Sequence, residues 1–82
     1  MLQMRPGCEC CDRDLPPDDA AARICSFECT FCSDCADMRL AGRCPNCGGE
    51  LLPRPRRATD KLAKFPASTT RVFKPEGCAK AP

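Results

Sequence analysis

The sequence contains no histidine, no tryptophan and no tyrosine. Without histidine the chain lacks the commonest general base of enzymes, and Cys–His nucleophile pairs cannot form. Once cysteine and alanine are set aside, only fifteen large apolar residues are left in a chain of 82 residues. A core built from so few side chains does not offset the conformational entropy lost on folding. The fold therefore needs covalent cross-links or metal coordination to stabilise it.

Long apolar stretches are also missing. No run of residues approaches the length of a membrane-spanning helix. The first seven residues lack the basic and apolar regions that make up a secretory signal. These absences predict a cytoplasmic protein with no membrane partner, in a compartment where thiols stay reduced.

Cysteine is the residue type in excess, with ten in the chain. Most of them stand in pairs with two residues between the members, a spacing that is typical of metal-binding knuckles rather than of disulfide frameworks. Because histidine is absent, we expect each metal ion to bind four thiolates. Such sites are closed to water and are structural, so the sequence predicts a protein that is not an enzyme. The expected cofactor is zinc, as two ions, with the ligands Cys8, Cys11, Cys25, Cys29, Cys32, Cys35, Cys44 and Cys47.

Two further cysteines are not needed as ligands in this assignment. Cys8 and Cys11 have the knuckle spacing, which makes Cys10 spare. In the alternative assignment Cys10 replaces one of these two ligands. Cys78 stands alone in the last part of the chain, and we expect it to be a free thiol.

The centre of the chain is expected to hold the regular structure. A short hairpin carrying Cys25 and Cys29 fits the pattern best, and one short helix is expected to start at Cys35 and to cover residues 36–40, with Gly42 where a helix would end. We expect Phe27 and Phe31 to pack in the core, because so few other large side chains are present. The predicted fold class is a small metal-stabilised α+β domain.

The charge distribution divides the chain into two parts. Residues 1–52 carry a net charge of −4, whereas residues 53–82 hold eight Lys or Arg against two acidic residues, a net charge of +6. The second part also contains five prolines and few apolar residues, a composition that predicts disorder. We therefore expect a two-zinc domain over residues 1–52 and a basic, Pro-rich, disordered tail over residues 53–82.

With Cys10 set aside, the order of the ligands resembles the cross-brace of RING-type zinc domains, which are treble-clef folds. The run CTFCSDC over residues 29–35 and Pro45 after the seventh ligand also resemble that family. The resemblance covers residues 8–47 and implies two interleaved sites. One zinc would take Cys8, Cys11, Cys32 and Cys35, and the other would take Cys25, Cys29, Cys44 and Cys47. The spacing leaves open a ribbon pairing, in which one zinc takes Cys29, Cys32, Cys44 and Cys47.

A closer resemblance covers residues 1 to about 53. The runs CECCDRDLPPD, ICSFECTFC and CPNCGGEL are similar to those of a family of short bacterial Cys-rich proteins, domain-of-unknown-function family 1272. Membership implies a cytosolic bacterial zinc protein with no assigned activity.

The expected function is a monomeric, non-enzymatic zinc module that binds a protein partner, such as an adaptor. One alternative is nucleic-acid binding, in which phosphates would be neutralised by Arg54, Arg56 and Arg57. A second alternative is a ubiquitin-ligase-like module. Glu9 and Gly48 disfavour it, because RING ligases usually carry an aliphatic and a basic residue at these positions. A third is a thiol redox enzyme, for which no thioredoxin-like βαβ pattern is present.

Overall fold

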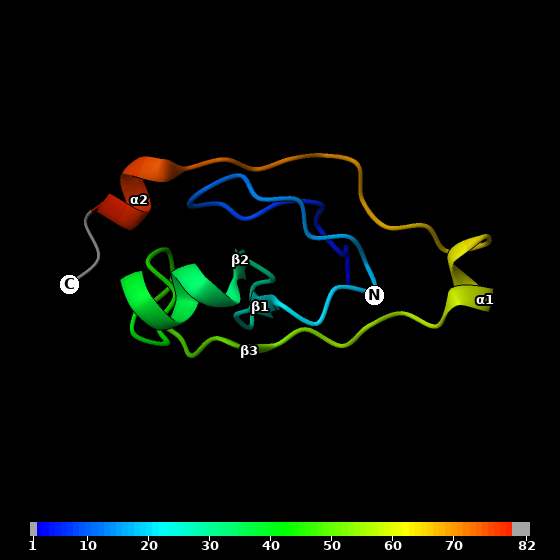
Figure 1. Ribbon diagram of the computed structural model, residues 1–82, viewed down its shortest axis with the longest axis horizontal. Helices are drawn as coiled ribbons and strands as arrows, with labels where there is room; N and C mark the ends of the chain where they lie inside the picture. The colour runs from blue at the N-terminus through cyan, green and yellow to red at the C-terminus, as the bar shows by residue number, and fades with distance from the viewer. Residues whose placement is uncertain (1, 80–82) are drawn as a thin grey trace.

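The computed structural model describes residues 2–79. In chain order the elements are β1 (Ala22–Ile24), β2 (Thr30–Cys32), the short helix η1 (Cys35–Arg39), β3 (Leu52–Pro53), α1 (Thr59–Leu62) and α2 (Pro75–Ala79) (Figure 1). The predicted α+β class is confirmed, with one small sheet and one short helix over residues 2–53. We call residues 2–52 the head and the rest of the described chain the tail. Within the described residues, no helix is long and apolar enough to cross a membrane.

The sheet has three antiparallel strands in the order β2-β1-β3. In β1, Ala22 lies opposite Cys32 and Ile24 lies opposite Thr30, so the two strands form the predicted hairpin. Its turn closes where the N–H of Cys25 donates to the C=O of Cys29, 3.2 Å away. The hairpin therefore presents two thiols at its tip and one thiol at the end of β2.

Helix η1 begins at Cys35, as predicted. Its turn is wider than an α-helical turn, because the N–H of Leu40 donates to the C=O of Cys35 at 3.0 Å. Gly42 follows with a φ of +77°, the left-handed conformation expected at the end of the helix. Leu40 faces the core, whereas Met38 is 85% exposed.

The core consists of thiols together with a few small and large apolar side chains. Phe31 is fully buried, as predicted. Phe27 is 70% exposed, so the prediction that it packs in the core is wrong. The reason is local: the hairpin turn wraps around a sulfur atom, since the N–H of Phe27 donates to Sγ of Cys25 at 3.3 Å. This turn holds the aromatic side chain on the outside of the head.

The disorder predicted for the basic tail is not confirmed over residues 53–79. This segment leaves the sheet at β3, runs out to α1 and returns along the opposite side of the head to α2 (Figure 1). On its return, the N–H of Ser68 donates to the C=O of Gln3 at 2.8 Å, and the N–H of Lys74 donates to the C=O of Glu9 at 2.9 Å. Such backbone hydrogen bonds to the head are contacts that amino-acid composition does not reveal. Residues 80–82 of the predicted tail lie outside the described part.

Candidate metal centres

The first group of thiols brings two distant knuckles together. The sulfur atoms of Cys8, Cys11, Cys32 and Cys35 all lie within 4.8 Å of one another. The N–H of Cys10 donates to Sγ of Cys8 at 3.4 Å, which is the contact that a knuckle makes to a thiolate. Sγ of Cys11 and Sγ of Cys32 are 3.7 Å apart, although 21 residues separate them in sequence. Three of these thiols are buried, and Cys11 is exposed.

The second group lies at the tip of the hairpin. The sulfur atoms of Cys25, Cys44 and Cys47 lie within 4.8 Å of one another. The N–H of Gly49 donates to Sγ of Cys47 at 3.4 Å. The fourth expected ligand, Cys29, is outside the set of mutually close sulfurs. The thiols of Cys25 and Cys44 nevertheless influence the pKa of Cys29, which burial raises.

The two groups alternate along the chain, with the first and third pairs in one group and the second and fourth pairs mostly in the other. This is the cross-brace arrangement that the RING resemblance implies. The ribbon pairing differs from it, since Cys32 lies with the first group and Cys44 and Cys47 lie with the second. The structure supplies the grouping of the thiols; their role as zinc ligands stays a prediction.

The titration of the thiols suits metal binding. Burial raises the pKa of Cys35, and it raises the pKa of Cys44 to about 12. Burial acts on Cys32 in the same direction, but hydrogen bonds from the backbone N–H of Cys35 and from nearby thiols outweigh it and lower the pKa of Cys32. The pKa of Cys25 is lowered in the same way, with the N–H of Phe27 as donor. Each group thus contains one thiol whose pKa is lowered beside another whose pKa is raised and which must lose its proton when a cation binds.

Zinc binding is therefore expected to release protons at neutral pH. Thiols such as Cys44 carry a proton before zinc binds and lose it when they become thiolate ligands. The zinc affinity therefore falls as the pH is lowered. Calorimetric titration in two buffers of different ionisation enthalpy measures the number of protons released. Equal apparent enthalpies in both buffers would contradict thiol ligation.

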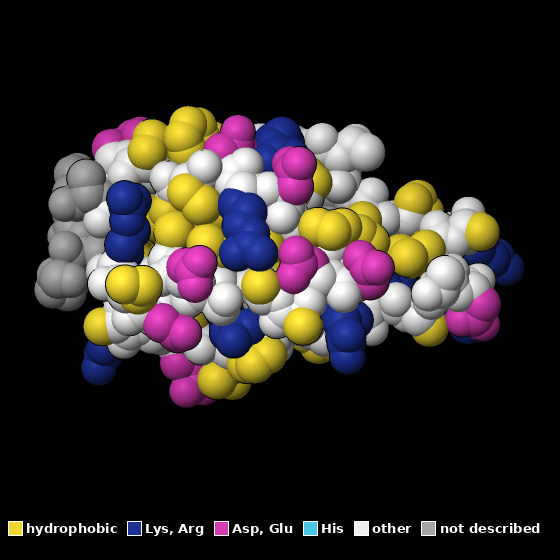
Figure 2. All heavy atoms as spheres, viewed as in Figure 1, with side chains coloured by type: hydrophobic (Ala, Val, Ile, Leu, Met, Phe, Trp, Pro, Cys, Tyr) yellow, Lys and Arg dark blue, Asp and Glu magenta, His cyan; other side chains and the backbone are white. Residues whose placement is uncertain are grey.

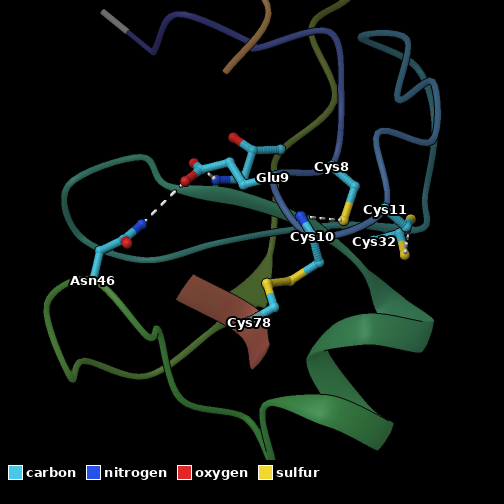
Figure 3. Close-up of a disulfide and its surroundings, with 8 residues drawn as sticks. Cys8, Glu9, Cys10, Cys11, Cys32, Asn46 and Cys78 are labelled. Carbon is cyan, nitrogen blue, oxygen red and sulfur yellow. Dashed lines mark hydrogen bonds between the residues drawn. A yellow bond between two sulfur atoms is a disulfide. The ribbon is translucent and has the colours of Figure 1, made fainter. Parts of the chain in front are cut away.

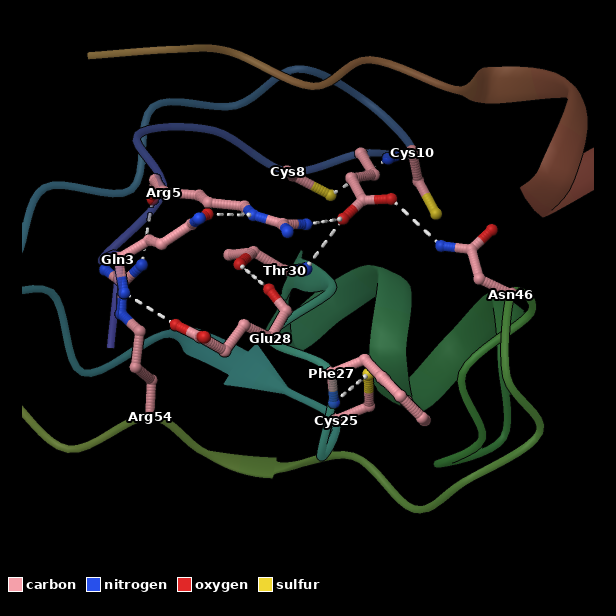
Figure 4. A network of polar contacts seen from close by, with 11 residues as sticks. Gln3, Arg5, Cys8, Cys10, Cys25, Phe27, Glu28, Thr30, Asn46 and Arg54 are labelled. Atoms are coloured by element: carbon pink, nitrogen blue, oxygen red, sulfur yellow. Dashed lines mark hydrogen bonds and ion pairs between the residues drawn. The ribbon is translucent and has the colours of Figure 1, made fainter. Parts of the chain in front are cut away.

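A buried carboxylate connects the two thiol groups. Glu9 lies inside the first knuckle and is only 1% exposed. Its carboxylate accepts hydrogen bonds from the N–H of Thr30 at 2.9 Å and from Nδ2 of Asn46 at 3.0 Å (Figure 4). It also pairs with Nη1 of Arg5 at 3.2 Å. Because Asn46 stands between Cys44 and Cys47, Glu9 joins the frame of one site to the frame of the other.

The sequence did not reveal this role for Glu9. Its position, where RING ligases usually carry an aliphatic residue, indicated only that the ligase contact surface is absent. Nothing in the sequence indicated which residues would hydrogen-bond to this carboxylate. The one signal was an acidic residue between cysteines of a knuckle, which needs partners if it is buried.

Cys10 and Cys78 form a disulfide, so the prediction that Cys78 is a free thiol is wrong (Figure 3). The preferred assignment of Cys10 as spare agrees with the structure, because Cys10 lies outside both thiol groups. The other eight cysteines of the described chain are not disulfide-bonded. Sequence reasoning missed the pair because the two residues are 68 positions apart.

Three arginines were predicted as possible phosphate contacts, and they have different environments. Arg54 is 5% exposed, and its guanidinium donates to the carbonyl groups of Arg5, Leu15 and Pro16. The guanidinium of Arg57 likewise donates to backbone carbonyl groups, one of them at residue 2. Only Arg56 is exposed. Two of the three arginines that were predicted to contact nucleic acid therefore bind backbone carbonyl groups of the head instead.

Apolar side chains reach the surface close to the second thiol group. Leu52 is 54% exposed, and Phe27 projects from the hairpin tip. A groove of about 420 Å³ lies here, lined by Ile24, Cys25, Ser26, Glu50, Leu52 and Pro53. We call this groove, together with Phe27, the hairpin face.

Comparison with known proteins agrees with the resemblance drawn from the sequence. The family described as "Protein of unknown function (DUF1272)" matches residues 1–57. An uncharacterized protein of Rhizobium meliloti (strain 1021) is 66% identical over 79 residues, which cover 96% of this chain and 94% of that protein. No solved structure gives a significant match. The motifs, the paired thiols and these matches together show that the chain belongs to the DUF1272 family.

Proposed function

We propose that the chain is a non-enzymatic protein-interaction module whose fold is built on two zinc ions. The observation that supports this most strongly is the interleaved grouping of the thiols. Each group draws on segments far apart in sequence, so a metal ion in each would tie the knuckles, the hairpin and helix η1 into one unit. Small domains with few large apolar residues are commonly stabilised in this way.

The donor set favours zinc and a structural role. Thiolates select soft or borderline ions, and four of them around zinc leave no position for a substrate or an activated water. No histidine is present to act as a base beside such a site. A closed centre of this kind positions surfaces and does not itself carry out a reaction.

The hairpin face is the surface that we assign to a partner. It combines the exposed ring of Phe27 with an apolar groove that has Glu50 on its lining. The head is acidic, at −4 before metal binding, and two tetrathiolate zinc centres would each add about −2. A protein segment with an apolar side chain flanked by Lys or Arg would complement this face.

Native mass spectrometry of the protein purified under mildly reducing conditions tests the metal part of the proposal. We expect a mass increase of two zinc ions, and loss of zinc on acidification. One zinc ion would mean that only the first, complete group binds metal. A protein that folds with no bound metal would overturn the proposal.

Replacing Phe27 by Ser is expected to abolish partner binding while leaving the zinc content at two. The ring contributes no buried contact to the core, so the fold does not depend on it. Phe73→Ser is the matched control, because Phe73 is also exposed, at 52%, but lies on the returning tail. In quantitative pull-downs with the zinc-loaded proteins, partner proteins should be retained by the wild type and by the control but lost with Phe27→Ser. Their binding to the wild type should weaken as the salt concentration rises. Identical prey sets for all three proteins would contradict the assigned face.

Nucleic-acid binding through the tail has less support. Arg54 is buried and Arg57 donates to carbonyl groups, as described above. On the face shown in Figure 2, Lys and Arg side chains alternate with Asp and Glu and do not form one basic patch. Phosphate binding favours a continuous basic stripe.

A further inference from the structure

We propose that the Cys10–Cys78 disulfide is a reversible redox latch, which holds residues 66–79 against residues 3–14 until a dithiol reductant opens it. One half of the bond lies inside the first knuckle, and the other half lies on α2 (Figure 3). The Cα atoms are 5.6 Å apart, a distance ordinary for a disulfide. No ligand role competes for either sulfur, since both lie outside the thiol groups.

The polar contacts of the returning segment with the head are the two backbone hydrogen bonds described above, from Ser68 and from Lys74, and the bonds of Arg71. Arg71 bonds to the carboxylates of Asp12 and Asp14 at 3.0 and 2.9 Å, and its guanidinium lies over Gly7, where a Cβ would come within 2.6 Å of it. These three charged side chains are all more than a third exposed, so their ion pairs contribute little in water. Helix α2 has five residues and is too short to be stable alone. The disulfide is therefore the contact that decides whether this segment stays on the head.

The eight free thiols of the same chain favour a disulfide that is reversible over one that is permanent. Clusters of free thiols persist where the environment is reducing, and there disulfides are usually transient or redox-sensing. The bond is also well shielded when closed, since Cys10 is 3% and Cys78 is 6% exposed. A reductant therefore reaches the bond through a local fluctuation of α2, and release of the whole segment follows reduction.

The exchange is balanced with a dithiol as reductant. One thiolate of the dithiol attacks Sγ of Cys78, the S–S bond breaks, and Cys10 leaves as a thiolate that takes up a proton. The second thiol of the dithiol then displaces Cys78, so the dithiol becomes a disulfide and two protein thiols form. Two electrons and two protons pass to the protein. The eight thiols of the metal groups take no part.

Reduction of the disulfide would change which charged surfaces the protein exposes. The segment that leaves carries Arg71 and Lys74, and Asp12 and Asp14 on the head lose their ion pairs with Arg71. An intramolecular pairing of a basic segment with an acidic loop would thus be exchanged for two separate charged surfaces. The redox state of Cys10 and Cys78 would thus decide whether these charged surfaces are paired with each other or free to bind a partner.

Limited trypsin digestion tests the latch on the zinc-loaded full chain. Samples without reductant are compared with samples in dithiothreitol, at a concentration at which native mass spectrometry still shows the same zinc content. We expect cleavage after Arg71 to rise by roughly tenfold or more in reductant, because cleavage follows the population of the open form. Cys78→Ser should be cleaved at the fast rate in both conditions with its zinc content unchanged.

Several results would overturn the latch. One is the absence of a cross-link between the peptides that contain Cys10 and Cys78 in non-reduced digests. Another is a cross-link whose reduction leaves the cleavage rate unchanged. A third is release of zinc from Cys78→Ser, which would make the bond part of the structural core. The zinc count is read separately, so a failure of the latch is distinguishable from a failure of the metal proposal.

Discussion

Removing zinc is expected to unfold residues 8–52 in a single cooperative transition. Structural zinc in small domains contributes on the order of 10–16 kcal/mol, whereas the whole stability of a domain is about 5–15 kcal/mol. Here the core is made largely of the thiols themselves, so little apolar burial would be left once the ions are gone. Far-ultraviolet circular dichroism during titration with a strong chelator would follow the transition, and proton NMR would report the loss of dispersed amide signals.

Controls can separate metal loss from other effects of a chelator. Adding back zinc should restore the signal, whereas magnesium should not, because thiolates bind hard ions poorly. Cys35→Ser should lose one zinc ion, since Cys35 belongs to the complete first group. Cooperative thermal unfolding that persists in excess chelator would refute the idea that metal holds the fold.

Replacing Glu9 by Ala is expected to destabilise the zinc-loaded protein by about 2–4 kcal/mol, between the costs of one orphaned buried donor and of a broken buried ion pair. The buried N–H of Thr30 would lose its partner, and Arg5 and Asn46 would lose theirs. Because the carboxylate links the frames of the two sites, zinc should also dissociate faster from the variant. Thermal unfolding monitored by circular dichroism and chelator-competition rates measure the two effects.

Glu50→Ala is the matched control for this substitution. Glu50 is exposed on the hairpin face and should change stability by no more than about 0.5 kcal/mol, as expected for a surface residue. Glu9→Gln keeps one acceptor oxygen and should fall between the two variants. Stability and zinc release in Glu9→Ala equal to those of the control would show that the carboxylate is not a structural link.

The grouping of the ligands was accessible from the sequence for a local reason. In a knuckle, the backbone N–H groups one or two residues after a cysteine turn toward its sulfur, as they do at Cys8, Cys25 and Cys47. This geometry requires only a few consecutive residues, so spacing reveals it. The assignment of knuckles to two separate sites came from resemblance, and the sulfur positions agree with it except at Cys29, which is displaced.

Other parts of the site depend on residues that meet only after folding. Cys10 finds Cys78 from 68 residues away, and Glu9 finds Asn46 from 37 residues away. Arg54 was assigned to phosphate by its charge, yet its guanidinium donates to three backbone carbonyl groups of the head. Composition and spacing carry no information about such pairs.

Composition and spacing are enough to predict that this fold needs stabilising cross-links or metal ions, that thiols provide them, and that the thiols fall into knuckles. Those predictions follow from too few large apolar residues, from the absence of histidine and from two-residue spacing. The places of the charged and spare residues depend instead on the three-dimensional packing. It buried Glu9, exposed Phe27 and returned the basic segment to the head. The physical reason is that a polar group has many possible partners, and the fold selects among them by what it brings within hydrogen-bonding distance.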